Sequence, residues 1–122
     1  MYIADGKTNG PAFSWPDGKR IAVMVTFDYD AEFLRISRAK SKGTSIGFTD
    51  FSRGQYGPHE GLARCLDMLD TMNIKSTFFV PGAVIETYRD TVEEIHRRGH
   101  ELACHGYRHE SDPELSRDEM IK

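Results

Sequence analysis

The chain has 122 residues, with 16 Lys or Arg against 19 Asp or Glu and a net charge of -3 at pH 7. This length, with 39% apolar and 29% charged residues, is typical of one soluble globular domain and excludes a disordered tail, a collagen-like repeat and a disulfide scaffold. The mild acidity argues against nonspecific nucleic-acid binding, and no apolar run approaches the roughly 18 residues needed to cross a bilayer.

The first half of the chain predicts one strand between two irregular segments. Residues 1–20 contain three glycines and two prolines and predict an irregular lead-in. Residues 21–27 are almost continuously apolar, which is typical of a strand buried on both faces. Residues 31–57 hold four glycines among polar and basic residues, so we expect a long loop there, of the kind that is usually functional or mobile.

The second half of the chain predicts two helices and two more strands. We expect a helix to open at Pro58, with an apolar stripe that comprises Leu62, Cys65, Leu66, Leu69 and Met72. Residues 76–80 predict a buried strand, and a second helix follows, which ends at Gly99. The apolar face of that helix comprises Ile85, Tyr88, Val92 and Ile95. Residues 101–105 predict a third strand.

The alternation of strands and helices predicts parallel βαβ units with right-handed crossovers, and hence an α/β fold. Near the end of the sequence, Ser116 and Glu119 form a capping box, which marks the start of a further helix. Only three residues follow it, too few for a stable turn. We therefore expect residues 21–122 to be the N-terminal part of a longer domain.

Acidic and imidazole side chains follow two of the predicted strands. Asp28 and Asp30 end the first strand and share one of its faces, because side chains alternate along a strand. His105 ends the third strand, and His109 follows four residues later. Parallel α/β domains place their chemistry at the carboxyl ends of strands. Two imidazoles and one carboxylate leave coordination positions open for water and substrate, as a catalytic zinc site requires.

Each of these motifs alone has an ordinary structural interpretation. An Asp-x-Asp pair is often a solvated strand end, and a His-x-x-x-His spacing is often accidental, but both motifs fall at independently predicted strand ends. Cys104 points away from His105 and is excluded from the metal site. The remaining candidates are interpreted as surface or structural residues; they are Cys65, His59, His96 and His100.

Three segments resemble one known family. Residues 26–30 (Thr-Phe-Asp-Tyr-Asp), 76–82 (Ser-Thr-Phe-Phe-Val-Pro-Gly) and 98–109 are similar, in this order, to motifs of the polysaccharide deacetylase (NodB-homology) family. The resemblance implies a distorted (β/α) barrel, of which this chain holds the N-terminal β-α-β-α-β portion. It also implies hydrolysis of N-acetyl groups with a bound divalent metal, usually zinc. By position, Asp28 matches the catalytic base, and Asp30, His105 and His109 match the metal ligands.

The spacing of the two aspartates leaves the substrate open. Tyr29 separates them, whereas the commonest family motif has adjacent aspartates, and this spacing is more similar to peptidoglycan deacetylase-like and allantoinase-like proteins. The substrate is then an N-acetylated sugar or polysaccharide, or a small cyclic amide or ureide enclosed by residues 31–57 as a lid. Because the family's proton donor and oxyanion donors come from later motifs, a non-catalytic metal-binding or oligomer-forming fragment is a third alternative.

The remaining expectations concern partners and location. No nucleic acid or membrane partner is expected, and a homo-oligomer remains open. Only two cysteines occur, and residues 1–7 lack the apolar segment of an export signal. Both observations favour a cytoplasmic protein.

Overall fold

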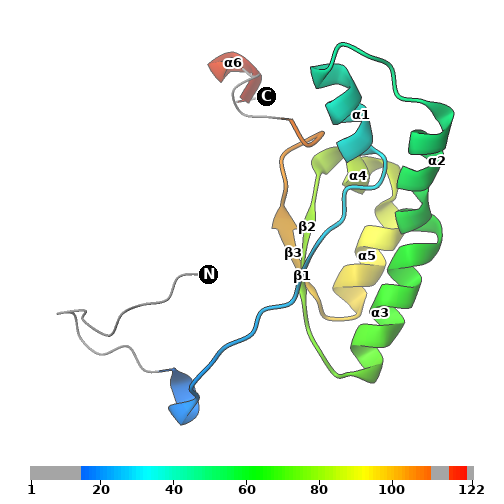
Figure 1. The fold of residues 1–122 in the computed structure, drawn as a ribbon. Coiled ribbons are helices and arrows are strands. Elements are labelled where there is room, and N and C mark those ends of the chain that lie inside the picture. Colours follow the sequence, from blue (N-terminus) through cyan, green and yellow to red (C-terminus); the bar gives the residue numbers. More distant parts are fainter. Residues whose placement is uncertain (1–14, 111–115, 121–122) are drawn as a thin grey trace.

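A computed structural model describes residues 15–110 and 116–120 of the chain (Figure 1). Its sheet has three parallel strands in the order β1-β2-β3, which are Thr26–Asp28, Thr77–Val80 and Glu101–Cys104. The helices are η1 (Pro16–Gly18), α1 (Phe33–Ser41), α2 (Phe48–Tyr56), η2 (Gly57–Gly61), α3 (Leu62–Thr71), α4 (Gly82–Thr87), α5 (Arg89–Arg97) and α6 (Arg117–Met120). The predicted parallel α/β arrangement is confirmed.

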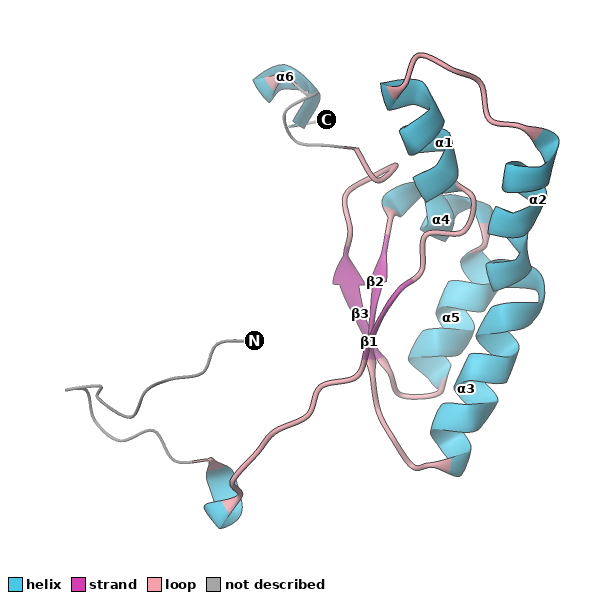
Figure 2. Cartoon of the chain, in the orientation of Figure 1, coloured by secondary structure: helices cyan, strands magenta, loops and turns pink. Residues whose placement is uncertain are grey.

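The hydrophobic core lies between the sheet and the helices on one of its sides (Figure 2). The predicted stripe of α3 is buried at Leu62, Leu66 and Leu69, whereas Met72 lies beyond the helix and is exposed. The other buried residues of this core cluster are Tyr29, Phe78, Val80, Val84, Val92 and Ile95. Full burial of such side chains stabilises the fold by about 1.5–3 kcal/mol each. The 3.6-residue spacing of the leucines therefore predicted correctly which face of α3 is buried.

The register brings the carboxyl ends of the strands to the same edge of the sheet. Phe78 pairs with Phe27 of β1 and with Leu102 of β3. Tyr29 continues the pairing one residue past β1, since its N–H donates to the Phe79 carbonyl at 2.8 Å. The chain therefore leaves the sheet at Asp30, on the same edge at which it leaves β3 at His105.

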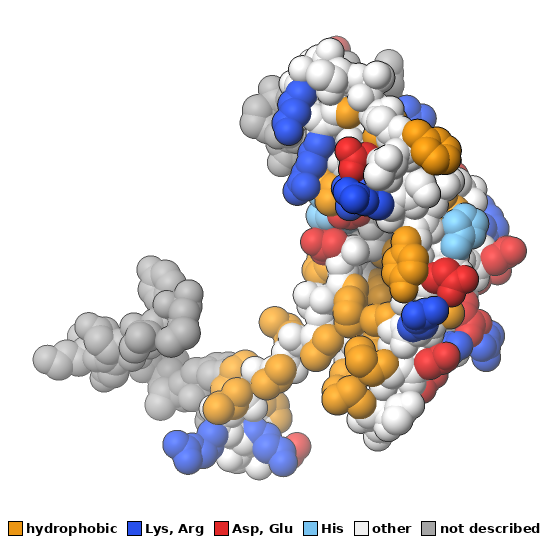
Figure 3. All heavy atoms as spheres, turned by 45° about the vertical axis from the view of Figure 1, so that its right-hand side comes forward, with side chains coloured by type: hydrophobic (Ala, Val, Ile, Leu, Met, Phe, Trp, Pro, Cys, Tyr) orange, Lys and Arg blue, Asp and Glu red, His pale blue; other side chains and the backbone are white. Residues whose placement is uncertain are grey.

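The prediction of a buried strand over residues 21–27 was wrong for most of its length. β1 begins at Thr26, and Ile21, Val23 and Met24 are 78%, 82% and 87% exposed. Figure 3 shows hydrophobic side chains lining this extended segment as it approaches the body of the molecule. An apolar run records a preference for burial, but burial also needs a covering layer, and the described residues supply none for residues 21–24.

The prediction of a loop over residues 31–57 was also wrong, because α1 and α2 lie there. Two of the glycines mark helix boundaries rather than irregular structure. Gly43 follows α1 with φ +66, and Gly47 is the N-cap of α2. Gly54 lies inside α2, where it packs against the backbone of Glu32. A glycine inside a helix normally weakens it. At Gly54 the close contact with Glu32, which is distant in the sequence, explains why a glycine is present.

Two helix boundaries also differ from those predicted. The helix expected from Pro58 begins ten residues earlier, because α2 continues into α3 through the π-helical turn η2, in which the Leu62 N–H donates to the Gly57 carbonyl. The next predicted helix is divided at Tyr88, whose φ and ψ are -124° and 44°. In the first part, α4, Val84 is buried, whereas Ile85 is 39% exposed. α6 does begin after Ser116, as the capping box predicts.

Candidate metal centre

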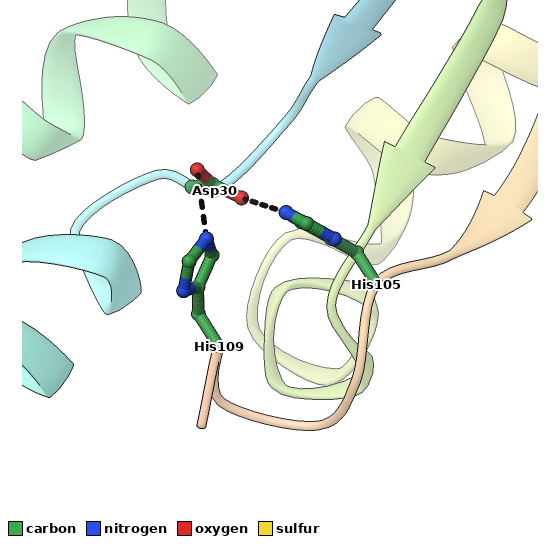
Figure 4. A group of neighbouring side chains, drawn as sticks. All are labelled: Asp30, His105 and His109. Atoms are coloured by element: carbon green, nitrogen blue, oxygen red, sulfur yellow. Dashed lines mark ion pairs between the residues drawn. The ribbon is translucent and has the colours of Figure 1, made fainter. Parts of the chain in front are cut away.

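Three side chains from two strand ends converge on one point (Figure 4). Asp30 Oδ1 lies 3.5 Å from His105 Nε2, and Asp30 Oδ2 lies 3.8 Å from His109 Nε2. One ligand atom from each residue lies within 4.8 Å of the other two. Among the described residues, this is the one such group of three potential metal ligands. The predicted donors are therefore brought together, and the carboxylate presents a different oxygen to each imidazole.

The state of the donor atoms fits a bound cation. The Asp30 side chain is 12% exposed. Its Oδ1 atom and His105 Nε2 are both buried and have no hydrogen-bond partner within the described chain. Buried polar atoms in native proteins are nearly always paired, and 3.5 Å exceeds the length of a charge-assisted hydrogen bond. A divalent ion about 2.0–2.2 Å from each donor would satisfy both atoms at once.

The electrostatics of Asp30 also favour a positive charge at this point. Burial raises the pKa of its carboxyl, and the negative charge of Asp28 raises it further. The two imidazoles and Arg38 act in the opposite direction but do not cancel the effect of burial. A cation held by the carboxylate would stabilise its ionised form.

The loop after β3 is held against the start of α4. The N–H groups of Gly82 and Ala83 donate to the carbonyls of Gly106 and Tyr107, at 3.0 and 2.9 Å. A side chain at position 82 would overlap the Tyr107 ring. The sequence analysis gave Gly82 no separate role, and a glycine directly after a strand was the available signal for this close approach.

Two nearby residues, Asp28 and Cys104, lie outside the cluster of three donors. Asp28 is exposed, and it lies two residues before Asp30 on a strand whose side chains alternate between faces. Cys104 is exposed and is not among the three clustered donors. It does line, with both imidazoles, Gly106 and Glu110, a hollow of about 310 Å³ beside the centre.

The histidines that the sequence analysis set aside lie away from the centre. His59 and His96 are exposed. His100 is buried at the opposite end of β3, where its Nδ1 accepts a hydrogen bond from the Ser76 N–H at 3.2 Å. Their interpretation as surface or structural residues is confirmed.

Proteins with similar sequences include two that are named as peptidoglycan deacetylases or as similar to them. The chain is 31% identical over 110 residues to peptidoglycan deacetylase-like protein FGM2 of Gibberella zeae. The aligned region covers 85% of this chain and 32% of that protein. It is 37% identical over 93 residues to a peptidoglycan deacetylase of Helicobacter pylori. This aligned region covers 76% of this chain and 31% of that protein. The chain thus spans about a third of the length of these curated relatives.

A solved structure and a family model give the same result. The crystal structure of a protein assigned as a polysaccharide deacetylase from Mycobacterium smegmatis superposes with a TM-score of 0.75 at 41% identity. The superposition covers 89% of this chain and 38% of that one. The family model for polysaccharide deacetylases matches residues 16–122. Together with the parallel sheet and the Asp-His-His cluster at its edge, these matches show that the chain belongs to the polysaccharide deacetylase family.

Proposed function

We propose that this chain carries the metal-binding half of an active site that hydrolyses a carbon–nitrogen amide bond other than a peptide bond. The proposed reaction is removal of the acetyl group from an N-acetylated sugar or polysaccharide. The convergence of Asp30, His105 and His109 is the observation that carries the proposal. The names of the relatives from Gibberella zeae and Helicobacter pylori support peptidoglycan-like substrates.

The roles of the residues follow from their positions. A divalent ion bound here, for which we propose Zn²⁺, would supply polarisation of the amide carbonyl and a lower pKa of bound water. Asp30, His105 and His109 would hold this ion on one side and leave the other side free for substrate. Asp28 would act as general base, since a carboxylate that is close to the centre but outside the ligand set can accept a proton there.

The remaining catalytic groups are proposed to lie outside this chain. Amide hydrolysis also needs donors for the oxyanion and a proton for the departing amine. We propose that the rest of the protein completes a distorted (β/α) barrel and supplies these groups at the same edge of the sheet.

A paired assay on the full-length protein that contains this chain tests the proposal. The Zn²⁺-loaded protein is incubated with an N-acetylglucosamine oligomer and, separately, with hydantoin and allantoin. Release of acetate from the oligomer is expected. Ring opening without acetate release would replace the deacetylase proposal with a cyclic amide hydrolase. Zinc binding without turnover of either substrate class would contradict catalysis and favour a non-catalytic metal protein.

A further inference from the structure

One candidate ligand, and the residue that directly follows another, have backbone conformations that L-residues rarely adopt. Ala31, directly after Asp30, has φ +49, and His109 itself has φ +60. In this region the Cβ atom crowds the backbone, so a residue other than glycine remains there only when the surrounding structure holds it. The contacts that hold Asp30 and His109 are therefore part of the construction of the site.

The segment around Asp30 is tied to the corner between α4 and α5. Glu32 is buried although it is charged, and the Tyr88 hydroxyl donates to its two carboxylate oxygens at 3.0 and 2.9 Å. On the other side of Asp30, the Tyr29 hydroxyl and Thr91 Oγ1 are hydrogen-bonded at 2.8 Å. Two hydrogen-bonding connections to one corner thus flank the candidate ligand and restrict how the strand end can turn.

The backbone of His109 is tied to α1. Ser37 Oγ, in the middle of α1, donates to the His109 carbonyl at 2.8 Å. This bond restricts the orientation of the peptide group that follows His109. Glu32 is the N-cap of the same helix. α1 is therefore linked to the segments of two candidate ligands that are far apart in the sequence. Its N-cap, Glu32, lies two residues after Asp30, and Ser37 is hydrogen-bonded to the backbone of His109.

We propose that α1 is a positioning element of the metal centre and that Glu32 and Ser37 are its positioning residues. They set the direction in which Asp30 and His109 present their ligand atoms to a divalent cation. Neither residue is among the clustered donors, so both act through the ligands rather than on the ion. This inference rests on the proposed metal-dependent function.

The test compares variants that remove single hydroxyl groups from the full-length protein. Ser37→Ala removes the bond to His109, and Tyr88→Phe removes the bonds to Glu32. Ser41→Ala is the matched control for the first, because Ser41 Oγ donates to the Ser37 carbonyl within the same helix and not to a ligand segment. Tyr56→Phe, at an exposed tyrosine of α2, is the control for the second. Ser37→Thr keeps the hydroxyl and serves as the rescue.

Each protein is titrated with Zn²⁺ by calorimetry, its Co²⁺ form is examined by visible absorption, and its thermal midpoint is recorded. Loss of a group that orients a metal ligand typically weakens metal binding about 10- to 100-fold. We expect a weakening of about tenfold or more, with an altered Co²⁺ band, in Ser37→Ala and Tyr88→Phe, and affinities like that of the parent in the controls and in Ser37→Thr.

The outcomes separate the two proposals. A parent protein that binds no Zn²⁺ overturns the metal-dependent function, and the role of α1 with it. A parent that binds Zn²⁺ while Ser37→Ala and Tyr88→Phe keep its affinity and its Co²⁺ spectrum overturns only the role of α1. A variant whose thermal midpoint falls while its Co²⁺ spectrum at saturation is unchanged also overturns the role of α1, because its substituted residue contributes to stability alone.

Discussion

Asp30 is the residue on which the candidate centre depends most, since its two carboxylate oxygens face different imidazoles. The burial of Asp30 removes water that would otherwise solvate its negative charge. A cation bound between Asp30, His105 and His109 would compensate for this loss. The arrangement makes the individual contributions of the ligands and of the nearby Asp28 measurable by substitution.

Removal of one ligand is expected to abolish metal binding. Asp30→Ala or His105→Ala leaves two protein ligands, which cannot hold a catalytic ion against competition from water. Zinc titration by calorimetry checks this result, with His96→Ala on the exposed face of α5 as the matched control. Unchanged zinc affinity in Asp30→Ala would remove this residue from the proposed centre.

Substitution of Asp28 is expected to separate binding from turnover. Asp28→Asn preserves shape but cannot accept a proton, so zinc affinity should remain near that of the parent while kcat falls about 10²- to 10⁴-fold, the usual contribution of a general base. Zinc titration and acetate release, measured on the same preparation, check both parts. An active Asp28→Asn protein would assign the base to another residue.

At the scale of elements, α1 and α2 are held together where Gly54 meets Glu32. A Cβ atom at position 54 would overlap the backbone and Cβ of Glu32, so the two helices would have to move apart to accommodate it. The contact also lies next to the hydrogen bonds between Tyr88 and Glu32. Packing between α1 and α2 and the position of the Asp30 segment are thus coupled.

Gly54→Ala is expected to destabilise the protein although alanine is the better helix former. Overpacking at a tight contact typically costs about 1–3 kcal/mol, more than the gain of about 1 kcal/mol in helix propensity. Gly57→Ala is the control, because a Cβ there meets only the Tyr29 ring, at an ordinary 4.0 Å. Free energies of unfolding from denaturant titration check the pair, and equal values for both variants would contradict the proposed tight contact.

At the scale of the whole molecule, His100 links folding stability to pH. Burial lowers the pKa of this imidazole, and the positive charge of Lys75 lowers it further. Its Nδ1 accepts the Ser76 N–H, so a proton on Nδ1 would break that bond. The unfolded chain binds this proton more readily than the folded one, and the stability contributed by neutral His100 is therefore present above pH 6.5, the ordinary pKa, and lost as pH falls below it.

We expect the free energy of unfolding to fall between pH 7 and pH 5, and His100→Asn to weaken this dependence. Asparagine offers an acceptor oxygen close to the position of Nδ1 but does not titrate. Denaturant titrations at several pH values check the slope, with His96→Asn at an exposed position as the control. A slope that persists unchanged in His100→Asn would show that other groups control the acid sensitivity.

Particular residues show how far sequence patterns reach in this protein. The stripe of Leu62, Leu66 and Leu69 predicted its buried face because a 3.6-residue period is a local property of a helix. The same kind of local evidence failed for Ile21, because its apolar character does not say whether a covering layer exists. It failed again at Gly54, because a helix-breaking residue can be retained for a contact with another element.

The sequence by itself determined the parallel α/β arrangement and the grouping of Asp30, His105 and His109. Strand hydrophobicity is local, and parallel strands must bring their carboxyl ends to one edge of the sheet. Only the tertiary structure decided that α1 replaces the expected loop, and that Glu32 and Ser37 contact Tyr88 and His109, which lie 56 and 72 positions away. No periodicity encodes such contacts, since they arise from packing between elements that are distant along the chain.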